Sequence, residues 1–177
     1  GGMVQVTRFS DGSEMKTLEI GKSVGQSAVL IIPGRNLLIA SGIGIPIKVW
    51  NTKTWELIKD LPSGISGSYL AIDYTGSRLA VGGDKGEVQV WNLNTFAKEF
   101  DLVGHRKNVT GLAFAPDGSR LITTSYDLTM KAWELNSGTC MLTLRNFRLP
   151  IFCIYFFNDG KRILYSNWEG ESGLWTY

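Results

Sequence analysis

The chain has 177 residues, 44% of them hydrophobic, so it can bury a core as one domain or a small pair of domains. Its 18 basic and 16 acidic side chains give a net charge of +2 without a run of five like charges. That balance gives no sign of a nucleic-acid or acidic-membrane partner. Gly, Pro, Asp or Asn interrupts every apolar run well before the roughly 18 residues of a membrane-spanning helix. We expect a soluble protein.

The amino terminus and the cysteines indicate the setting of the protein. Gly1 and Gly2 precede Met3 and are interpreted as a leftover of expression cloning, outside the fold, and no secretory signal follows them. Cys140 and Cys153 fall in predicted strands, with no spacing typical of a disulfide framework or a zinc site. We expect buried, inert thiols and a reducing location, either cytoplasmic or nuclear.

The first predicted elements are a strand over residues 4–9, "VQVTRF", and a second strand that follows the turn in "SDGSEMKTLEI" at 10–20. They match the third and fourth strands of a sequence repeat that recurs along the rest of the chain. Thr7 stands where that repeat carries tryptophan.

A repeat of about 42 residues organises the chain from residue 24 on. Four similar turn stretches are "VLIIPGRNLL" at 29, "AIDYTGSRLA" at 71, "AFAPDGSRLI" at 113 and "YFFNDGKRIL" at 155. Their glycines are spaced by 42 throughout and the tryptophans that follow by 41, 42 and 42, at Gly34, Gly76, Gly118 and Gly160 and at Trp50, Trp91, Trp133 and Trp175. Such self-similarity is the signature of a repeat architecture.

Each repeat predicts four short strands. In the third unit these are 108–115, 119–125, 129–133 and 139–144, joined by turns that contain Gly, Asp or Asn. Apolar residues recur at equivalent places and are expected to face a core: Ala28, Leu70, Leu112 and Ile154 with Leu30, Ile72, Phe114 and Phe156 in the first strand, and Leu37, Leu79, Leu121 and Ile163 in the second. No window shows a helical period, so the protein is predicted to be all-β.

One such sheet cannot cover both of its own faces and must stack on its copies. Radial stacking of four-stranded antiparallel sheets gives a β-propeller, in which each sheet is a blade. The turn is repeated because each blade needs the same hairpin, and we expect its glycine to supply a positive φ.

The motifs "GH" at 104, "PDG" at 116, "TTSYD" at 123 and "KAW" at 131 make the chain resemble the WD-repeat (β-transducin-like) β-propeller family over essentially its whole length. The resemblance implies a structural tetrad of Asp127, His105, Thr123 and Trp133, in which the indole N–H, a neutral imidazole and a carboxylate form one hydrogen-bonded chain. The other units keep only the tryptophan. Their equivalents of His105, Thr123 and Asp127 are Ser63, Val81 and Lys85 in the second unit and Phe147, Tyr165 and Glu169 in the fourth.

The repeat predicts about four WD repeats, a half or partial propeller. It gives part of a blade over 3–20, blades at about 24–62, 66–103 and 107–145, and a last blade at 150–177 without its outer strand. Four blades are at the lower limit for a closed ring. We therefore expect either the remainder of a larger propeller or a homodimer that completes an eight-bladed ring, since open sheet edges recruit strands.

The residues that could carry catalysis have structural explanations. His105 is the only histidine, and its nearest candidate partners belong to the tetrad. The carboxylates Asp73, Asp117 and Asp159 lie at the glycine turns, where Asp bonds its own backbone. The glycine-rich segments lack the following helix and the Lys-Ser/Thr end of a phosphate-binding loop. We expect no enzyme, no cofactor and no metal.

The surface carries the remaining signal. Asp84, Tyr126 and Trp168 take equivalent places in the turns between second and third strands, and "HRKN" at 105 and "NFRL" at 146 enter the first strands. Exposed aromatic residues beside cations are typical of interaction hot spots, and the alternative is that Trp168 and Phe147 pack against a neighbouring blade. The candidate surface is thus Asp84, Tyr126, Trp168, Arg106, Lys107, Phe147 and Arg148.

The favoured function is a non-enzymatic scaffold that binds protein or peptide partners through loops at one end of the propeller. A propeller enzyme with a channel site is an alternative, although the repeats gather no acidic or metal-binding set across blades. A second alternative is nucleic-acid binding through "HRK" and "RNFR", which a strongly salt-dependent affinity would support.

Overall fold

The computed structural model describes residues 2–8, 10–22, 27–145 and 147–176. In these ranges the chain forms β-strands joined by turns, with one short 3-10 turn, η1 (Pro33–Arg35), so the all-β prediction is confirmed. The chain divides into two compact units, residues 1–68 and 69–177, and each is described by itself.

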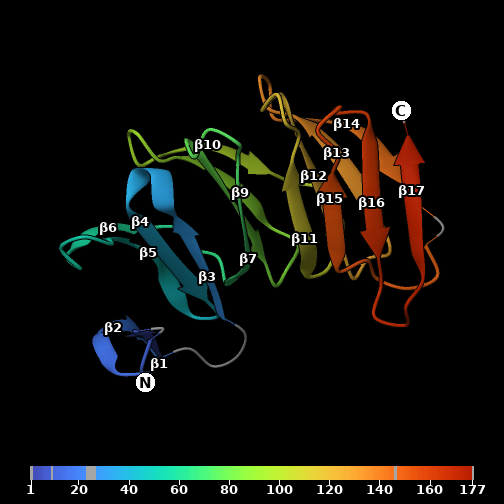
Figure 1. Cartoon of the computed structure of the whole chain (residues 1–177). Helices are drawn as coiled ribbons and strands as arrows, with labels where there is room; N and C mark the ends of the chain where they lie inside the picture. Colours follow the sequence, from blue (N-terminus) through green and yellow to red (C-terminus); the bar gives the residue numbers. More distant parts are fainter. Residues whose placement is uncertain (1, 9, 23–26, 146, 177) are drawn as a thin grey trace. The chain divides into compact units, whose positions relative to one another are not determined.

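The first unit contains a two-stranded hairpin and a four-stranded antiparallel sheet (Figure 1). The hairpin joins β1 (Gly2–Thr7) to β2 (Glu14–Gly21). The sheet has the order β3-β4-β5-β6, with β3 (Ser27–Ile32), β4 (Leu37–Gly42), β5 (Ile45–Asn51) and β6 (Leu57–Leu61).

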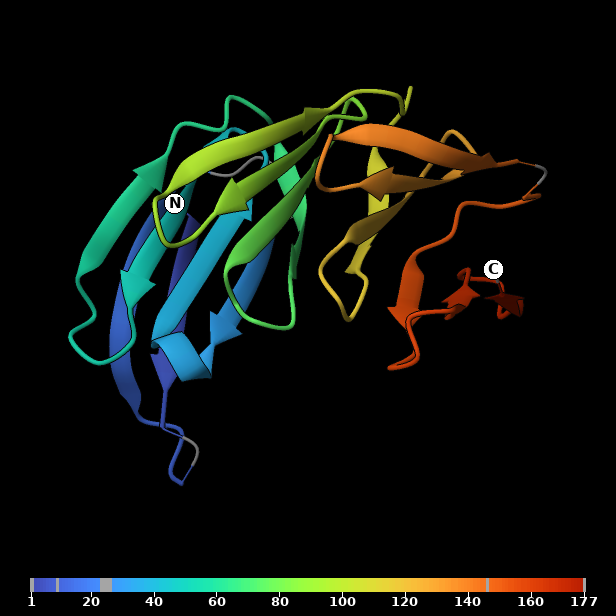
Figure 2. The same cartoon turned by 90° about the horizontal axis from the view of Figure 1, so that it is seen from above.

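Three further sheets follow. The first consists of β7 (Gly67–Ile72), whose first two residues precede the unit boundary, β8 (Arg78–Gly83), β9 (Val88–Asn92) and β10 (Ala97–Leu102). The second consists of β11 (Val109–Phe114), β12 (Arg120–Ser125), β13 (Met130–Glu134) and β14 (Thr139–Leu144), as predicted. The third has β15 (Cys153–Phe156), β16 (Arg162–Ser166) and β17 (Ser172–Thr176). Within each sheet, strands that neighbour in sequence neighbour in space (Figure 2).

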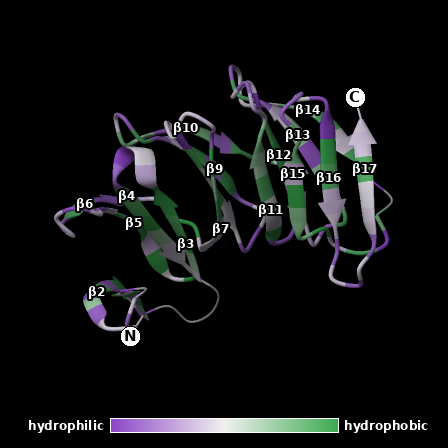
Figure 3. Cartoon of the chain, in the orientation of Figure 1, coloured by the Kyte–Doolittle hydropathy of each residue, from purple (hydrophilic) through white to green (hydrophobic). Residues whose placement is uncertain are grey.

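Neighbouring sheets of the second unit pack face to face. One apolar cluster joins Val90 and Leu102 to Phe114 and Trp133, and so lies between the sheet of β7–β10 and that of β11–β14. A second cluster continues onto the sheet of β15–β17 through Phe156. Apolar residues concentrate in the strands and polar ones in the turns (Figure 3). Since burying one large apolar side chain gives about 1.5–3 kcal/mol, this stacking is what stabilises the sheets.

The repeated core positions differ between strands. The second-strand residues are all buried, as predicted: Leu37, Leu79, Leu121 and Ile163. In the first strand only Phe114 and Phe156 are buried, and the other predicted core residues are half-buried. The reason is that β3, β7, β11 and β15 are edge strands, whose side chains lack a neighbour on one side.

The glycine turns follow the prediction at three of four places. Gly76, Gly118 and Gly160 have φ of +71°, +69° and +65°, the left-handed region that glycine adopts without a Cβ penalty. The prediction is wrong for Gly34, which lies in η1, because Asn36 takes the left-handed conformation there, with φ +53°. Asparagine is one of the few side chains that tolerates this region.

Two predictions about the termini and cysteines are wrong. Gly2 is not outside the fold, since it pairs with Gly21 in the β1–β2 hairpin. Cys140 and Cys153 lie in strands as expected, but both are free and exposed rather than buried, because each lies in an edge strand. Across the described residues, no helix has the length and apolar character needed to cross a membrane.

Candidate functional site

One end of the sheets in the second unit gathers the residues that sequence analysis singled out. In an antiparallel meander, the turn between second and third strands lies at the same end as the link to the next sheet. We call this the loop end. It comprises the turns 84–87, 126–129 and 167–171 and the links 103–108 and 145–152, of which residue 146 lies outside the described residues.

A buried hydrogen-bonded chain supports the loop end from below. The Trp133 indole N–H donates to Thr123 Oγ1 over 2.8 Å, and Thr123 Oγ1 is 2.7 Å from His105 Nε2. His105 Nδ1 lies 3.0 Å from Asp127 Oδ2. The structure therefore brings together all four side chains of the expected tetrad. This hydrogen-bonded chain connects the 103–108 link to β13, the third strand of the sheet that follows the link.

The protonation of His105 follows from its partners. Asp127 can only accept, so Nδ1 carries the proton, and Nε2 accepts the Thr123 hydroxyl hydrogen. Burial lowers the pKa of His105 and outweighs the opposing effect of Asp127, so the ring is neutral at pH 7. Burial alone would raise the pKa of Asp127, but hydrogen bonds from Thr129, the Arg106 N–H and His105 hold it below its usual range. The group is thus a structural brace with a neutral imidazole.

The preceding sheet satisfies its indole in another way. Val81 stands where the sheet of β11–β14 has Thr123, and it is fully buried. The Trp91 N–H donates instead to Gln89 Oε1, two residues earlier on β9, over 3.2 Å. This polar brace was missed by sequence reasoning, although a glutamine two residues before the tryptophan was visible.

An exposed aromatic cluster lies at the loop end. Trp168, in the β16–β17 turn, is 67% exposed and stacks on Phe152, with ring centroids 5.1 Å apart and an interplanar angle of 28°. Tyr126, in the β12–β13 turn, meets the same Phe152 edge to face at 5.4 Å. Phe152 was missed because it immediately precedes β15 and reads as part of a strand. Through it, turns of two neighbouring sheets share one aromatic surface.

The remaining candidates lie in the 84–87 turn and the 103–108 link. Arg106 and Lys107 are exposed at the loop end, and their backbones are fixed by Asp127 and Ser125: the Arg106 N–H donates to Asp127 and the Lys107 carbonyl accepts from Ser125 Oγ. Asp84 is half-exposed in the neighbouring turn. That turn touches the His105 link, since a Cβ on Gly86 would lie 2.6 Å from the His105 carbonyl oxygen. The geometry does not join Asp84 to the aromatic cluster.

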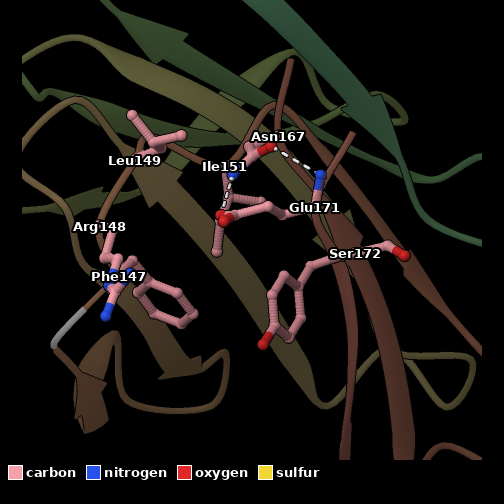
Figure 4. Close-up of a pocket in the computed structure, with 8 residues that line it drawn as sticks. Phe147, Arg148, Leu149, Ile151, Asn167, Glu171 and Ser172 are labelled. Atoms are coloured by element: carbon pink, nitrogen blue, oxygen red, sulfur yellow. Dashed lines mark hydrogen bonds between the residues drawn. The ribbon is translucent and has the colours of Figure 1, made fainter. Parts of the chain in front are cut away.

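Phe147 and Arg148 line a separate pocket of about 270 Å³ (Figure 4). Phe147 is half-buried and meets Tyr165 edge to face at 5.5 Å, so the reading that it packs against a neighbour applies to it. The opposite wall is the turn that carries Trp168: Asn167 Nδ2 donates to Glu171 Oε2, and the Glu171 N–H donates back to Asn167 Oδ1. These bonds hold the turn in shape beside the pocket.

The carboxylates at the glycine turns have structural partners. Asp73 Oδ1 accepts the Ser77 and Arg78 N–H groups, and Asp159 Oδ1 accepts those of Lys161 and Arg162. Asp117 Oδ1 accepts the Ser119 N–H over 3.0 Å. Backbone hydrogen bonds lower the pKa of Asp117 and Asp159, as expected for carboxylates used to fix turns. Within the described ranges no group of three His, Cys, Asp or Glu could hold a metal ion.

Comparison with known proteins shows similarity to WD-repeat proteins. Residues 96–134, which end with the buried Trp133 and the strand that carries it, match the family model described as WD domain, G-beta repeat. The chain is 29% identical over 116 residues to the periodic tryptophan protein 2 homolog of Neurospora crassa, covering 65% of this chain and 13% of that protein. It is 24% identical over 183 residues to transducin beta-like protein 3 of Bos taurus, covering 99% and 22%.

A third relative carries the repeat in its name. The chain is 33% identical over 87 residues to the WD repeat and SOCS box-containing protein 1 of Xenopus tropicalis, covering 48% of this chain and 21% of that protein. In these comparisons the chain spans less than a quarter of each relative's length.

Proposed function

We propose that this chain, which belongs to the WD-repeat family, is a non-enzymatic platform that binds a protein or peptide partner at its loop end. The observation that carries the proposal is the aromatic cluster of Tyr126, Phe152 and Trp168, in which Trp168 is exposed and the other two rings are half-buried. A tryptophan that is two-thirds exposed and already ordered by stacking offers a large apolar contact at little cost in side-chain entropy. Binding hot spots are enriched in such residues.

The surroundings support the same reading. Arg148 lies on the far side of the pocket that adjoins the Trp168 turn, and the Asn167–Glu171 hydrogen bonds fix the turn. A rigid aromatic anchor beside a pocket that carries one cation suits an extended peptide that places one side chain in the pocket. The histidine and the turn aspartates are held in structural hydrogen bonds, which supports a binding role over a catalytic one.

The wider setting is part of the proposal. We infer that the sheets within 27–61, 67–102, 109–144 and 153–176 act as blades of a WD propeller that continues in further blades, either in a second copy or in the rest of a longer protein. We place the protein in the cytoplasm or nucleus, since its two free thiols are exposed. Light scattering tests the homodimer: the chain mass is 19.6 kDa, so about 40 kDa supports it and about 20 kDa argues against it.

Selection from a random peptide library tests the binding role. Peptides enriched on the wild-type chain are expected to bind Trp168→Ala at least tenfold more weakly, since a hot-spot aromatic contributes about 1.4 kcal/mol or more. Tyr74→Ala is the matched control, because Tyr74 is 58% exposed in the β7–β8 turn at the opposite end of the sheets. Equal binding to Trp168→Ala and wild type would refute the proposed surface.

A further inference from the structure

In two of the four-stranded sheets, the polar side chain two residues before the tryptophan donates to a carboxylate opposite it on the fourth strand. In the β3–β6 sheet, Lys48 Nζ lies 2.9 Å from Asp60 Oδ1. In the β7–β10 sheet, Gln89 Nε2 donates to Asp101 Oδ1 over 2.9 Å. Both pairs are directly opposite in the strand register. In the sheets of β3–β6 and β7–β10, the fourth strand thus supplies a carboxylate opposite the polar residue that lies two before the tryptophan.

The sheet of β11–β14 keeps the cation and loses the carboxylate. Lys131 occupies the same position on β13, and its register partner is Thr143, whose Oγ1 accepts from Lys131 Nζ over 3.0 Å. Lys131 is only 7% exposed. No carboxylate of the described residues lies within ion-pair distance of its ammonium group. A buried ammonium without a counterion is costly, so this position is poised to take an anion.

Lys131 lines a pocket of about 270 Å³ at the loop end with two further cations, Arg106 and Arg145. Both arginines are exposed, and among the described residues neither forms an ion pair. Gly104 forms part of the wall: a Cβ there would lie 3.5 Å from Lys131 Cε. Lysine carries three donors and each arginine five, so the pocket presents many more donors than acceptors.

The single carboxylate of the pocket is already engaged. Asp127 Oδ1 accepts from the Thr129 N–H and hydroxyl, and Oδ2 from His105 and the Arg106 N–H. Its lone pairs point at these donors, so it forms no ion pair with the three cations and offsets only one of their charges. The lining therefore carries an excess of two positive charges.

We propose that this pocket binds the phosphate group of a phosphorylated serine or threonine in a partner peptide. A phosphate monoester carries close to two negative charges at pH 7 and three acceptor oxygens, which match the excess charge and the three cationic side chains. A carboxylate would leave one positive charge uncompensated. The inference rests on the proposed function for the source of the phosphate, and it adds a second contact point at the loop end.

The chain itself supplies the decisive variant. Thr143→Asp installs opposite Lys131 the carboxylate that Asp60 provides to Lys48, so it should neutralise the ammonium without removing it. Thr143→Asn has the same shape without charge and is the control. The probe is N-acetyl-O-phosphoserine N-methylamide, titrated against 15N-labelled protein by NMR, with the unphosphorylated serine compound in parallel.

We expect the phosphorylated probe to shift the amide signals of Arg106 and Lys131 saturably, and the unphosphorylated probe to leave them unchanged. Thr143→Asp should weaken binding at least tenfold, whereas Thr143→Asn should stay within threefold of wild type. The double variant Arg106→Ala with Arg145→Ala removes two exposed cations that form no ion pair among the described residues, and it should also weaken binding at least tenfold. An absent shift, or equal binding by Thr143→Asp and wild type, would overturn the site.

A second arm tests the source of the phosphate. Random peptides with a central phosphoserine should compete with the probe more strongly than single-stranded oligonucleotides or phosphoinositide vesicles, and the reverse order would overturn the peptide assignment. The outcome is distinguishable from that of the proposed function. If unphosphorylated peptides bind in a Trp168-dependent way but the phosphoserine probe does not bind, the aromatic surface is supported and the phosphate site is refuted. If the probe binds but no selected peptide depends on Trp168, the phosphate site is supported and the aromatic surface is refuted.

Discussion

The brace beneath the loop end yields a sharp prediction for Thr123→Val. Valine has nearly the shape of threonine but lacks the hydroxyl that accepts from the Trp133 indole and donates to His105 Nε2. All three side chains are buried, so water cannot replace the lost partner. The substitution leaves one donor and one acceptor unsatisfied, with little change in packing.

The magnitude follows from those two groups. An unsatisfied buried polar group costs about 1–3 kcal/mol, so with two such groups Thr123→Val should lower the free energy of unfolding by about 2–6 kcal/mol. Thr123→Ser is the matched control, because it keeps the hydroxyl and removes one methyl group, at about 1 kcal/mol. If packing rather than hydrogen bonding dominated, the order of the two variants would reverse.

Urea unfolding followed by circular dichroism gives the free energies, and hydrogen exchange of the Trp133 indole N–H reports the brace alone. Exchange of that proton should accelerate strongly in Thr123→Val and little in Thr123→Ser. A loss below about 0.5 kcal/mol for Thr123→Val, or an indole proton that stays protected, would refute the reasoning.

Three further predictions concern single groups in the sheets. Because the pKa of His105 is lowered from its usual 6.5, the unfolded chain binds more protons than the folded chain just below pH 6.5. The urea midpoint should therefore decrease when the pH is lowered from about 7.5 to about 5.5, and it should decrease less in His105→Gln. A midpoint that increases on acidification would contradict this. Gly118→Ala should cost about 1 kcal/mol because of its positive φ, although nothing crowds the Cβ, whereas Gly34→Ala should be neutral to within about 0.5 kcal/mol; equal thermal shifts would count against the turn assignment. Gln89→Leu should cost about 1–3 kcal/mol because the buried Trp91 N–H loses its acceptor, and unchanged urea stability would show that water reaches the indole.

The sequence predicted the strands well because they depend on local patterns, whereas the tetrad of Asp127, His105, Thr123 and Trp133 was implied by the family resemblance. The 42-residue spacing of Gly76, Gly118 and Gly160 fixes hairpins by backbone conformation alone, and alternating apolar residues fix which face is buried. The prediction of a positive φ failed at Gly34 because a neighbouring asparagine can adopt the same left-handed conformation.

The sites were harder to predict because they depend on which residues of different sheets or strands meet. The stacking of Trp168 on Phe152 joins a turn to a link, and neither residue alone indicates it. The uncompensated charge of Lys131 appears only when its register partner Thr143 is compared with the carboxylate opposite Lys48. Exposure of the cysteines depended on sheet edges, which strand periodicity does not reveal.

We propose the loop end of the second unit as the partner-binding surface. Hydrogen–deuterium exchange with a selected peptide tests it most directly, because it reports every part of the chain without a prior choice of residue. We expect slower exchange in the 126–129 and 167–171 turns and the 147–152 link, with the β7–β8 turn around Tyr74 unchanged. Protection confined to the β7–β8 and β11–β12 turns would contradict it.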